Sequence, residues 1–429
     1  MNMFRLFVPL LCATISLTAL AQSTATLQNN LPQRTLRVDY DFSGDAKTQH
    51  IALSALCSFP GWAGRHTHMD SVPLTGNGDI TMADAQTHRV IYKQSFSTLF
   101  QEWLSTEEAT RTQRSFENTY LLPMPSNKAE VTVRLYNNQG EVQSSFTHVV
   151  DPHDILIRQL DHSPVPPHRY LHYSGNSAEK IDVAIVAEGY TQGQSDRFYA
   201  DAQKAVNAIL SHEPFKHYAH RFNFVAVAAA STDSDVSVPK EGIWRHTALS
   251  SHFSTFYSDR YLTTLHQRDL HNLLVGIPYE HIIILANTDT YGGGGIYNAY
   301  TLTTAHHSQF EPVVVHEFGH SFGGLADEYY YDDQYENYYS DSREPWEQNL
   351  TTLHNFAAKW QDMLPPHTSI PTAPDVRHME RIGVYEGGGY MSKGVYRAYQ
   401  DCRMKTNECK AFCPVCQRAL SRLIEFYTE

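Results

Sequence analysis

Residues 313–328 of this chain read VVVHEFGHSFGGLADE, and this segment decides how the rest of the sequence is interpreted. His316 and His320 are four positions apart, so a helix places both rings on one face, where they can bind a single Zn²⁺. Glu317 lies beside the first histidine and can act as a general base toward water at the metal without being a ligand itself. The segment therefore predicts an active-site helix that carries a catalytic zinc ion.

The residues around the two histidines predict where this helix packs and where it ends. Three valines, residues 313–315, precede His316 and favour a helix pressed against a sheet. Gly323 and Gly324 follow His320 and are typical of a helix C-terminus. The alternative, a structural helix with surface histidines, does not account for a glutamate placed as a ready base.

A catalytic zinc site needs a third protein ligand, and the segment after the glycines supplies two acids. The segment resembles the metzincin-type zinc peptidases, whose pattern is HExxHxxGxxH, or more rarely the same pattern with Asp at the end. This chain has one residue more before the turn glycine if that glycine is Gly324. Counting from Gly323 instead would place Ala326 at the ligand position, and alanine cannot bind metal. We predict Asp327 as the third ligand, with Glu328 as the alternative; the other acid would support a histidine N–H.

Three segments together resemble the IgA-peptidase family of bacterial zinc metallopeptidases, peptidase family M64. They are residues 316–330 (HEFGHSFGGLADEYY), residues 187–191 (AEGYT) and residues 396–404 (YRAYQDCRM). The resemblance covers roughly residues 170–429, and the region upstream looks like the accessory N-terminal domain of this family. It implies secretion, one catalytic zinc ion and cleavage of a protein substrate, but not that immunoglobulin A is the substrate.

The resemblance to metzincins also implies a methionine beneath the zinc. We predict Met404 for this position, with Met391 as the competing candidate. His306 and His307, just upstream of the helix, are expected at the surface or in a supporting role, not as ligands. The chain has 26 tyrosines, so the sequence does not single out one that could stabilise an oxyanion; Tyr396 and Tyr399 are not separable from the others.

The sequence predicts two domains. Short alternating runs from about residue 35 to 150 indicate antiparallel strands, and we expect a β-sandwich-like accessory domain over residues 22–160. Residues 161–170 contain three prolines close together and predict a stiff linker. Residues 171–429 then form the catalytic domain.

The catalytic domain reads as an α/β unit. Apolar runs at residues 181–187, 222–228 and 281–286 predict buried strands, and helical spacing is found at 195–210 and 262–274. After Gly292–Gly295 we expect an edge strand at Ile296–Leu302 that pairs with an extended substrate. The predicted fold is therefore a multidomain α+β and α/β chain: a β-sandwich-like domain followed by a metzincin-like zincin domain with a twisted, mostly parallel sheet and an active-site helix.

The chain begins with features of an export signal. Residues 6–20 are apolar but short for a membrane span, and Ala19-Leu20-Ala21 resembles a cleavage site, so residues 1–21 are predicted to be a signal peptide. An N-terminal anchor is the alternative. No other window predicts a transmembrane segment. Because of the predicted signal peptide, we expect an exported protein. The balance of 33 Lys and Arg against 46 Asp and Glu disfavours a nucleic-acid partner.

Four cysteines gather near the C-terminus: Cys402, Cys409, Cys413 and Cys416. Because export implies an oxidising compartment, we expect two disulfides among them and a free Cys57. The pair Cys413-Pro-Val-Cys416 keeps a zinc site as the alternative.

The sequence thus predicts a secreted zinc endopeptidase whose partner is a protein or peptide substrate. Two alternatives remain: a catalytically silent glycan- or protein-binding module with a structural metal, and a zinc amidase that acts on cell-wall peptides.

Overall fold

The computed structural model describes residues 33–331 and 338–429. The expected signal peptide lies outside these ranges. The first part of the described chain forms two four-stranded sheets. One has the order β5-β1-β2-β8 and the other β4-β3-β6-β7. Their strands are β1 (Arg34–Gly44), β2 (Gln49–Pro60), β3 (Gly78–Asp84), β4 (Val90–Phe96), β5 (Arg114–Pro123), β6 (Ala129–Tyr136), β7 (Val142–Val150) and β8 (Arg158–Gln159).

The two sheets pack as a sandwich because each turns one apolar face inward. In β6, alternate residues are buried, with Val131, Val133 and Leu135 in the core. Val38 and Tyr40 of β1 belong to the same apolar cluster. A short helix, α2 (Leu99–Leu104), begins after Thr98, whose side chain accepts a hydrogen bond from the Gln101 N–H.

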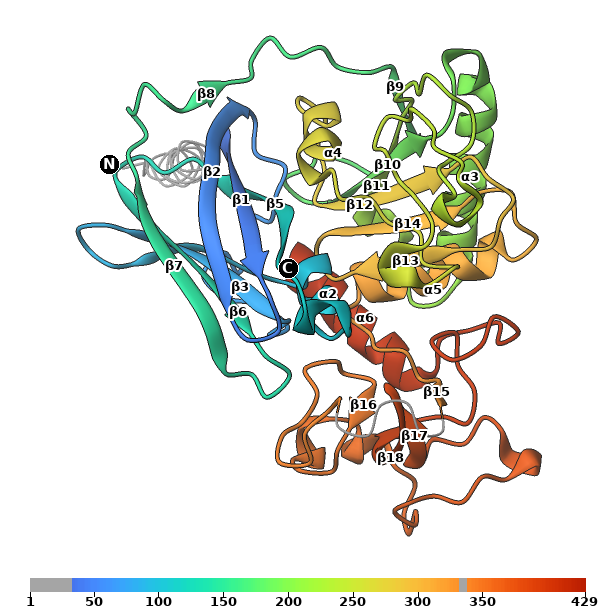
Figure 1. The fold of residues 1–429 in the computed structure, drawn as a ribbon. Coiled ribbons are helices and arrows are strands. Elements are labelled where there is room, and N and C mark those ends of the chain that lie inside the picture. Colours follow the sequence, from blue (N-terminus) through green and yellow to red (C-terminus); the bar gives the residue numbers. More distant parts are fainter. Residues whose placement is uncertain (1–32, 332–337) are drawn as a thin grey trace, which may run out of the picture.

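A six-stranded sheet with the order β13-β14-β12-β10-β11-β9 forms the centre of the second part (Figure 1). The four inner strands are parallel, while both edge strands run antiparallel to their neighbours. The strands are β9 (His168–His172), β10 (Ile181–Glu188), β11 (Phe222–Val227), β12 (His281–Ala286), β13 (Gly293–Ile296) and β14 (Tyr300–Thr304).

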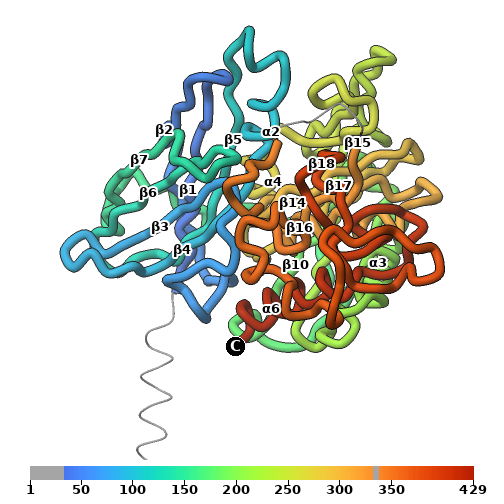
Figure 2. Tube along the Cα trace, turned by 90° about the horizontal axis from the view of Figure 1, so that it is seen from below, coloured from blue at the N-terminus to red at the C-terminus, as the bar shows by residue number. Residues whose placement is uncertain are grey.

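Both faces of this sheet are buried, as expected for parallel strands. One face contributes Val183 and Ile185 to an apolar core shared with α3 (Ser195–Ser211), α5 (Phe310–Ser321) and α6 (Pro414–Thr428). The other face, with Ala184 and Val186, joins the core of the N-terminal sandwich. Figure 2 shows the sandwich lying alongside the rest of the chain. Polar contacts join the two parts as well: the buried Arg37 donates to Asn272 Oδ1 at 2.7 Å.

Two predicted elements differ from the structure. The helix expected over 262–274 is only α4 (Gln267–Leu273). The edge strand expected at Ile296–Leu302 is wrong: Asn298 adopts a positive φ of 52° and turns the chain, so Tyr300 to Leu302 lie inside the sheet in β14. The edge is β13, which the glycines themselves form.

A small fourth sheet lies below the six-stranded sheet in Figure 1. It consists of β15 (Tyr330–Tyr331), β16 (Leu350–Thr351), β17 (Tyr385–Gly388) and β18 (Tyr390–Arg397). The pairing of β15 with β18 brings the chain just after the active-site segment beside residues 390–391. None of the described helices is long and apolar enough to cross a membrane.

His281, at the start of β12, makes stability depend on pH. Its ring packs edge-on against Phe322, its Nε2 has no hydrogen-bond partner in the described chain, and burial lowers its pKa to about 3. Below the ordinary histidine pKa of about 6.5, the unfolded chain takes up a proton that the folded chain cannot, so stability falls as the pH drops from that value. His281→Leu should reduce the loss of unfolding free energy between pH 7 and pH 5 by about 2 kcal/mol. Urea unfolding at both pH values tests this, with the exposed His153→Gln as control; equal losses in His281→Leu and wild type would contradict it.

Candidate active site

Helix α5 presents the two histidines and the glutamate of the motif on its polar side. The opposite side buries Val314, Val315 and Phe318 in the core shared with α3 and α6. This burial fixes the rotation of the helix, because an apolar stripe facing the core leaves His316, Glu317 and His320 facing outward. The side chains of His316 and His320 are 13% and 15% exposed, so both are accessible but shielded from bulk water.

Three donor atoms from this segment converge on one point. His316 Nε2 and His320 Nε2 are 3.0 Å apart. Asp327 Oδ1 lies 3.1 Å from the first and 3.2 Å from the second. A carboxylate oxygen of Glu317 is within 4.8 Å of the histidine ligand atoms. The structure therefore brings together all four residues that the sequence predicted for the site.

Each histidine is oriented by a backbone carbonyl. His316 Nδ1 lies 2.8 Å from the Arg403 oxygen, and His320 Nδ1 lies 2.6 Å from the Leu325 oxygen. A carbonyl can only accept, so each Nδ1 carries the proton and each Nε2 offers a lone pair in the neutral ring. Burial lowers the pKa of His320, but the neighbouring Asp327 outweighs it and raises that pKa to about 9. The hydrogen bonds at the two Nδ1 atoms leave both Nε2 atoms directed at the point where Asp327 Oδ1 also lies.

Asp327 is held by a tyrosine that the sequence analysis did not identify. The Tyr390 hydroxyl donates to Asp327 Oδ2 at 2.5 Å, which leaves Oδ1 facing the histidines. Burial, followed by the charge of Asp327, raises the pKa of Tyr390 well above its usual value. Nothing in the sequence sets Tyr390 apart from the other tyrosines, because only the pairing of β15 with β18 brings it beside Asp327.

The glycine strand β13 borders the site, and its lack of side chains is what lets it approach. A Cβ added at Gly295 would lie 2.3 Å from the Glu317 carbonyl oxygen and 2.9 Å from His320 Cβ. A Cβ at Gly293 would lie 3.3 Å from the Glu317 side chain. Only glycine permits this contact between the strand and the helix. The close approach of β13 to α5 thus explains Gly293 and Gly295.

Met404 packs against α5 at Gly319. It is fully buried, and a Cβ added at Gly319 would lie 2.7 Å from its sulfur, so the missing side chain at 319 makes room for it. Met391, the competing candidate, lies in β18 and accepts the Tyr339 N–H at its sulfur instead. The geometry thus places Met404, not Met391, against α5.

Two neighbouring histidines and the second acid lie elsewhere. His306 Nε2 is 2.7 Å from Asp201 Oδ2, and the His307 ring packs against Tyr291. Glu328 turns away from the histidines, and its Oε1 accepts from Asn349 and from the Cys416 thiol. Glu328 therefore does not compete with Asp327 for the point between the histidines.

The expected disulfides are wrong in this structure: Cys57, Cys402, Cys409, Cys413 and Cys416 are all free thiols. Cys402 Sγ and Cys416 Sγ are 3.8 Å apart, well beyond the bond length of about 2.05 Å. Cys409 lies half-buried, with its thiol directed at the Ala411 carbonyl. The prediction assumed that export alone decides the chemistry of the thiols, and it overlooked the carboxylate that the fold brings to them.

The N-terminal sandwich also reaches the site, through Glu102 of α2. The Tyr261 hydroxyl donates to Glu102. The ring of Tyr261 packs against β13, because a Cβ added at Gly294 would lie 2.6 Å from a ring carbon of Tyr261. Burial is the main cause that raises the pKa of Glu102 to about 7, and His320 and Glu317 are close enough to act on it electrostatically. The accessory domain thus forms part of the surroundings of β13.

A helix that carries two histidines and a glutamate, with an aspartate brought back to the histidines by a turn, is the arrangement of a metallopeptidase site. Family comparison agrees. The profile of the IgA peptidase M64 family matches residues 170–378 and 373–424, and the profile of the peptidase M64 N-terminus matches residues 27–147. The two ranges of the first profile together span residues 170–424, more than half of the chain, so the chain belongs to the M64 family of metallopeptidases, which act on proteins or peptides. A search among curated proteins found no match.

The contact between β13 and α5 can be tested by a single methyl group. Gly295→Ala should lower the free energy of unfolding by about 1 to 3 kcal/mol, because the strand must move away from the Glu317 carbonyl. Gly193→Ala is the matched control, since a Cβ there meets nothing within 4 Å. Urea unfolding of both variants measures the difference. Equal stabilities would show that β13 does not approach α5 this closely.

Proposed function

We propose that this protein is a secreted zinc endopeptidase. The observation that carries the proposal is the convergence of His316 Nε2, His320 Nε2 and Asp327 Oδ1 within 3.2 Å of one another, with the Glu317 carboxylate beside them. Secretion rests on the predicted signal peptide at residues 1–21.

The donor set fits zinc. Two imidazole nitrogens and one carboxylate oxygen are the ligands of a catalytic zinc site, which leaves a further position open. Both Nδ1 atoms donate to backbone carbonyls, so both Nε2 lone pairs are available. When bound, zinc would act as a Lewis acid toward the scissile carbonyl and lower the pKa of water.

Glu317 is placed to handle the proton of the reaction. Its carboxylate accepts a proton from the attacking water and then delivers it to the nitrogen of the leaving amine. Burial is the main cause that raises the pKa of Glu317, and a raised pKa makes the group both a better base and a usable acid near neutral pH. Its position next to His316 keeps it close to the metal without requiring it as a ligand.

Strand β13 offers a place for an extended substrate. In the described part of the chain, β13 pairs with β14 alone, so its outer edge has free backbone donors and acceptors. A peptide that adds to this edge would run past Glu317 and His320, which lie against the strand. Recognition through main-chain hydrogen bonds favours an extended polypeptide substrate over the zinc-amidase alternative.

A catalytically silent binding module with a structural metal at this site is the less favoured function. Structural zinc sites are closed by four protein ligands, whereas α5 and its following turn supply three. A half-buried glutamate beside an incomplete ligand set has a role in hydrolysis and none in a purely structural site.

Glu317→Gln should abolish peptide hydrolysis while zinc stays bound, because the ligands are unchanged and only the base is lost. We expect a loss of at least about 100-fold in kcat. Hydrolysis of an unlabelled protein mixture, read by mass spectrometry, and zinc analysis by plasma emission measure the two properties on the same sample. Activity retained with full zinc content would contradict the assigned base.

Asp327→Ala should weaken binding of the catalytic zinc by more than the 10 to 100-fold typical of losing a supporting hydrogen bond, because it removes a ligand. Competition with a chromogenic chelator measures the affinity. Asp362→Ala is the control, since Asp362 pairs with Arg418 on the surface. If Asp327→Ala binds zinc as tightly as the control, another group is the third ligand.

A further inference from the structure

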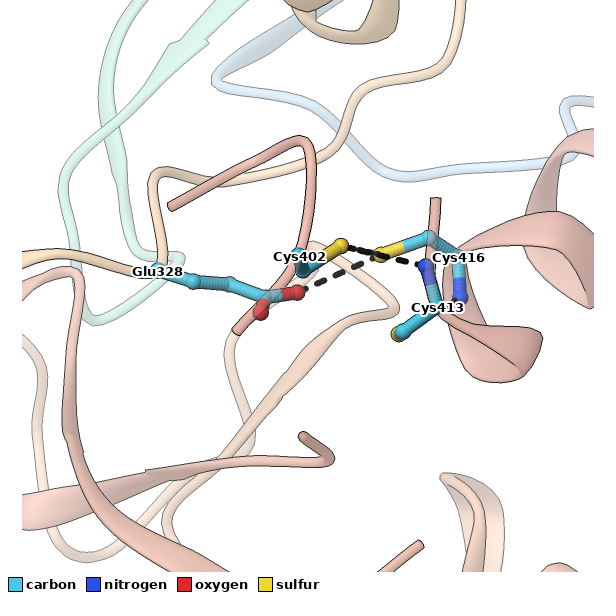
Figure 3. Close-up of side chains that lie close together, drawn as sticks. All are labelled: Glu328, Cys402, Cys413 and Cys416. Atoms are coloured by element: carbon cyan, nitrogen blue, oxygen red, sulfur yellow. Dashed lines mark hydrogen bonds between the residues drawn. The ribbon is translucent and has the colours of Figure 1, made fainter. Parts of the chain in front are cut away.

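A second cluster of metal-binding groups lies directly behind the catalytic residues. Glu328, Cys402, Cys413 and Cys416 each offer one ligand atom, and these four atoms all lie within 4.8 Å of one another (Figure 3). All four residues are buried, with exposed fractions of 0%, 0%, 3% and 0%. They come from three separate segments: the turn after α5, the segment after β18 and the start of α6.

One oxygen of the buried Glu328 carboxylate lacks a hydrogen-bond partner among the described residues. Its Oε1 accepts hydrogen bonds from Asn349 and Cys416, but its Oε2 has no hydrogen-bond partner among the described residues. The nearby Arg397 directs its Nη1 to the carbonyls of Glu386 and Gly387 instead. A fully buried carboxylate with an unsatisfied oxygen is costly, and each such group in a native protein calls for an unseen ion or water.

Two of the three thiols accept hydrogen bonds from backbone N–H groups. The Cys413 N–H donates to Cys402 Sγ at 3.2 Å, and the Cys416 N–H donates to Cys413 Sγ at 3.5 Å. Cys413 is also the N-cap residue of α6, where the helix dipole favours negative charge. Backbone N–H groups and a helix N-terminus both stabilise thiolates, which are the form of cysteine that binds metal.

We propose that Cys402, Cys413, Cys416 and Glu328 bind a second, structural zinc ion. Three thiolates select a soft or borderline metal, and four protein ligands leave no open position, as in structural zinc sites. On binding, three thiol protons leave and the Glu328 oxygen gains the cation that it lacks. A Cys402–Cys416 disulfide is the competing explanation, but it would leave Glu328 Oε2 without a partner among the described residues.

This zinc would fix the backbone that supports the catalytic site. Glu328 directly follows the proposed ligand Asp327, and its N–H donates to the Met404 carbonyl at 2.8 Å. Arg403, whose carbonyl orients His316, lies next to Cys402. One ion would thus connect three supports of the catalytic site: the proposed ligand Asp327, Met404, and the Arg403 carbonyl that orients His316.

The test counts zinc in the full-length exported chain purified under non-reducing conditions. We expect two equivalents in wild type, one in His316→Ala/His320→Ala, and two in Cys409→Ser, whose thiol lies outside the cluster. Cys416→Ser should lose one equivalent and melt at a lower temperature. Two equivalents in Cys416→Ser, or a Cys402–Cys416 disulfide in non-reduced peptides of the wild type, would overturn the proposal.

X-ray absorption at the zinc edge keeps the test decisive if Cys416→Ser does not fold. In His316→Ala/His320→Ala, the remaining zinc should have three sulfur ligands at about 2.3 Å and one oxygen at about 2.0 to 2.2 Å. A double variant that holds no zinc would overturn the proposal. If instead the wild type holds a single zinc with this sulfur-rich shell, the second site stands and the catalytic zinc of the proposed function fails, so the two failures are distinguishable.

Discussion

Two imidazole nitrogens and a carboxylate oxygen are held about 3 Å apart, and the rest of the structure can be understood as what makes this convergence possible. Three lone-pair donors at this separation are suited to bind a cation between them. Helix α5 supplies the nitrogens, and a turn through Gly324, with a φ of 55°, returns the chain so that Asp327 meets them. The Leu325 carbonyl in the same turn orients His320. The turn therefore has two functions, and a residue with a side chain would be strained at its glycine.

Close approach of backbone to α5 is the second constraint, and glycine makes it possible on both sides of the helix. On one side, Gly293 and Gly295 let β13 lie against Glu317 and His320. On the other, Gly319 makes room for the Met404 sulfur. The helix is thus held between a strand that could receive substrate and a segment that the buried cysteines anchor, and the N-terminal sandwich contributes Glu102 to the surroundings of the strand.

The sequence predicts those features of the fold and the site that the local spacing of residues determines. The four-residue spacing of His316 and His320 specifies a shared helix face, and continuous apolar runs specified the buried strands β10, β11 and β12. Choosing Asp327 over Glu328 needed only the count across the two glycines, and the structure turns the two acids to opposite sides.

The parts that were missed or misjudged depend on tertiary contacts. Tyr390 reaches Asp327 only because β18 pairs with β15, and no local pattern announces that pairing. The predicted edge strand, Ile296–Leu302, lies after the observed one, Gly293–Ile296. Glycines are poor strand formers in isolation, and the sequence does not show that these glycines pack closely against α5. The prediction of disulfides among the cysteines is wrong because the sequence does not show that Glu328 lies among them.

The most direct test of the central claim is an anomalous difference map, collected at the zinc absorption edge from crystals of the wild-type protein. The account predicts a peak coordinated by His316 Nε2, His320 Nε2 and Asp327 Oδ1, with Glu317 close by but outside the coordination shell. A map with no peak between these three residues, or a peak there that has Glu317 as a ligand in place of Asp327, would contradict it.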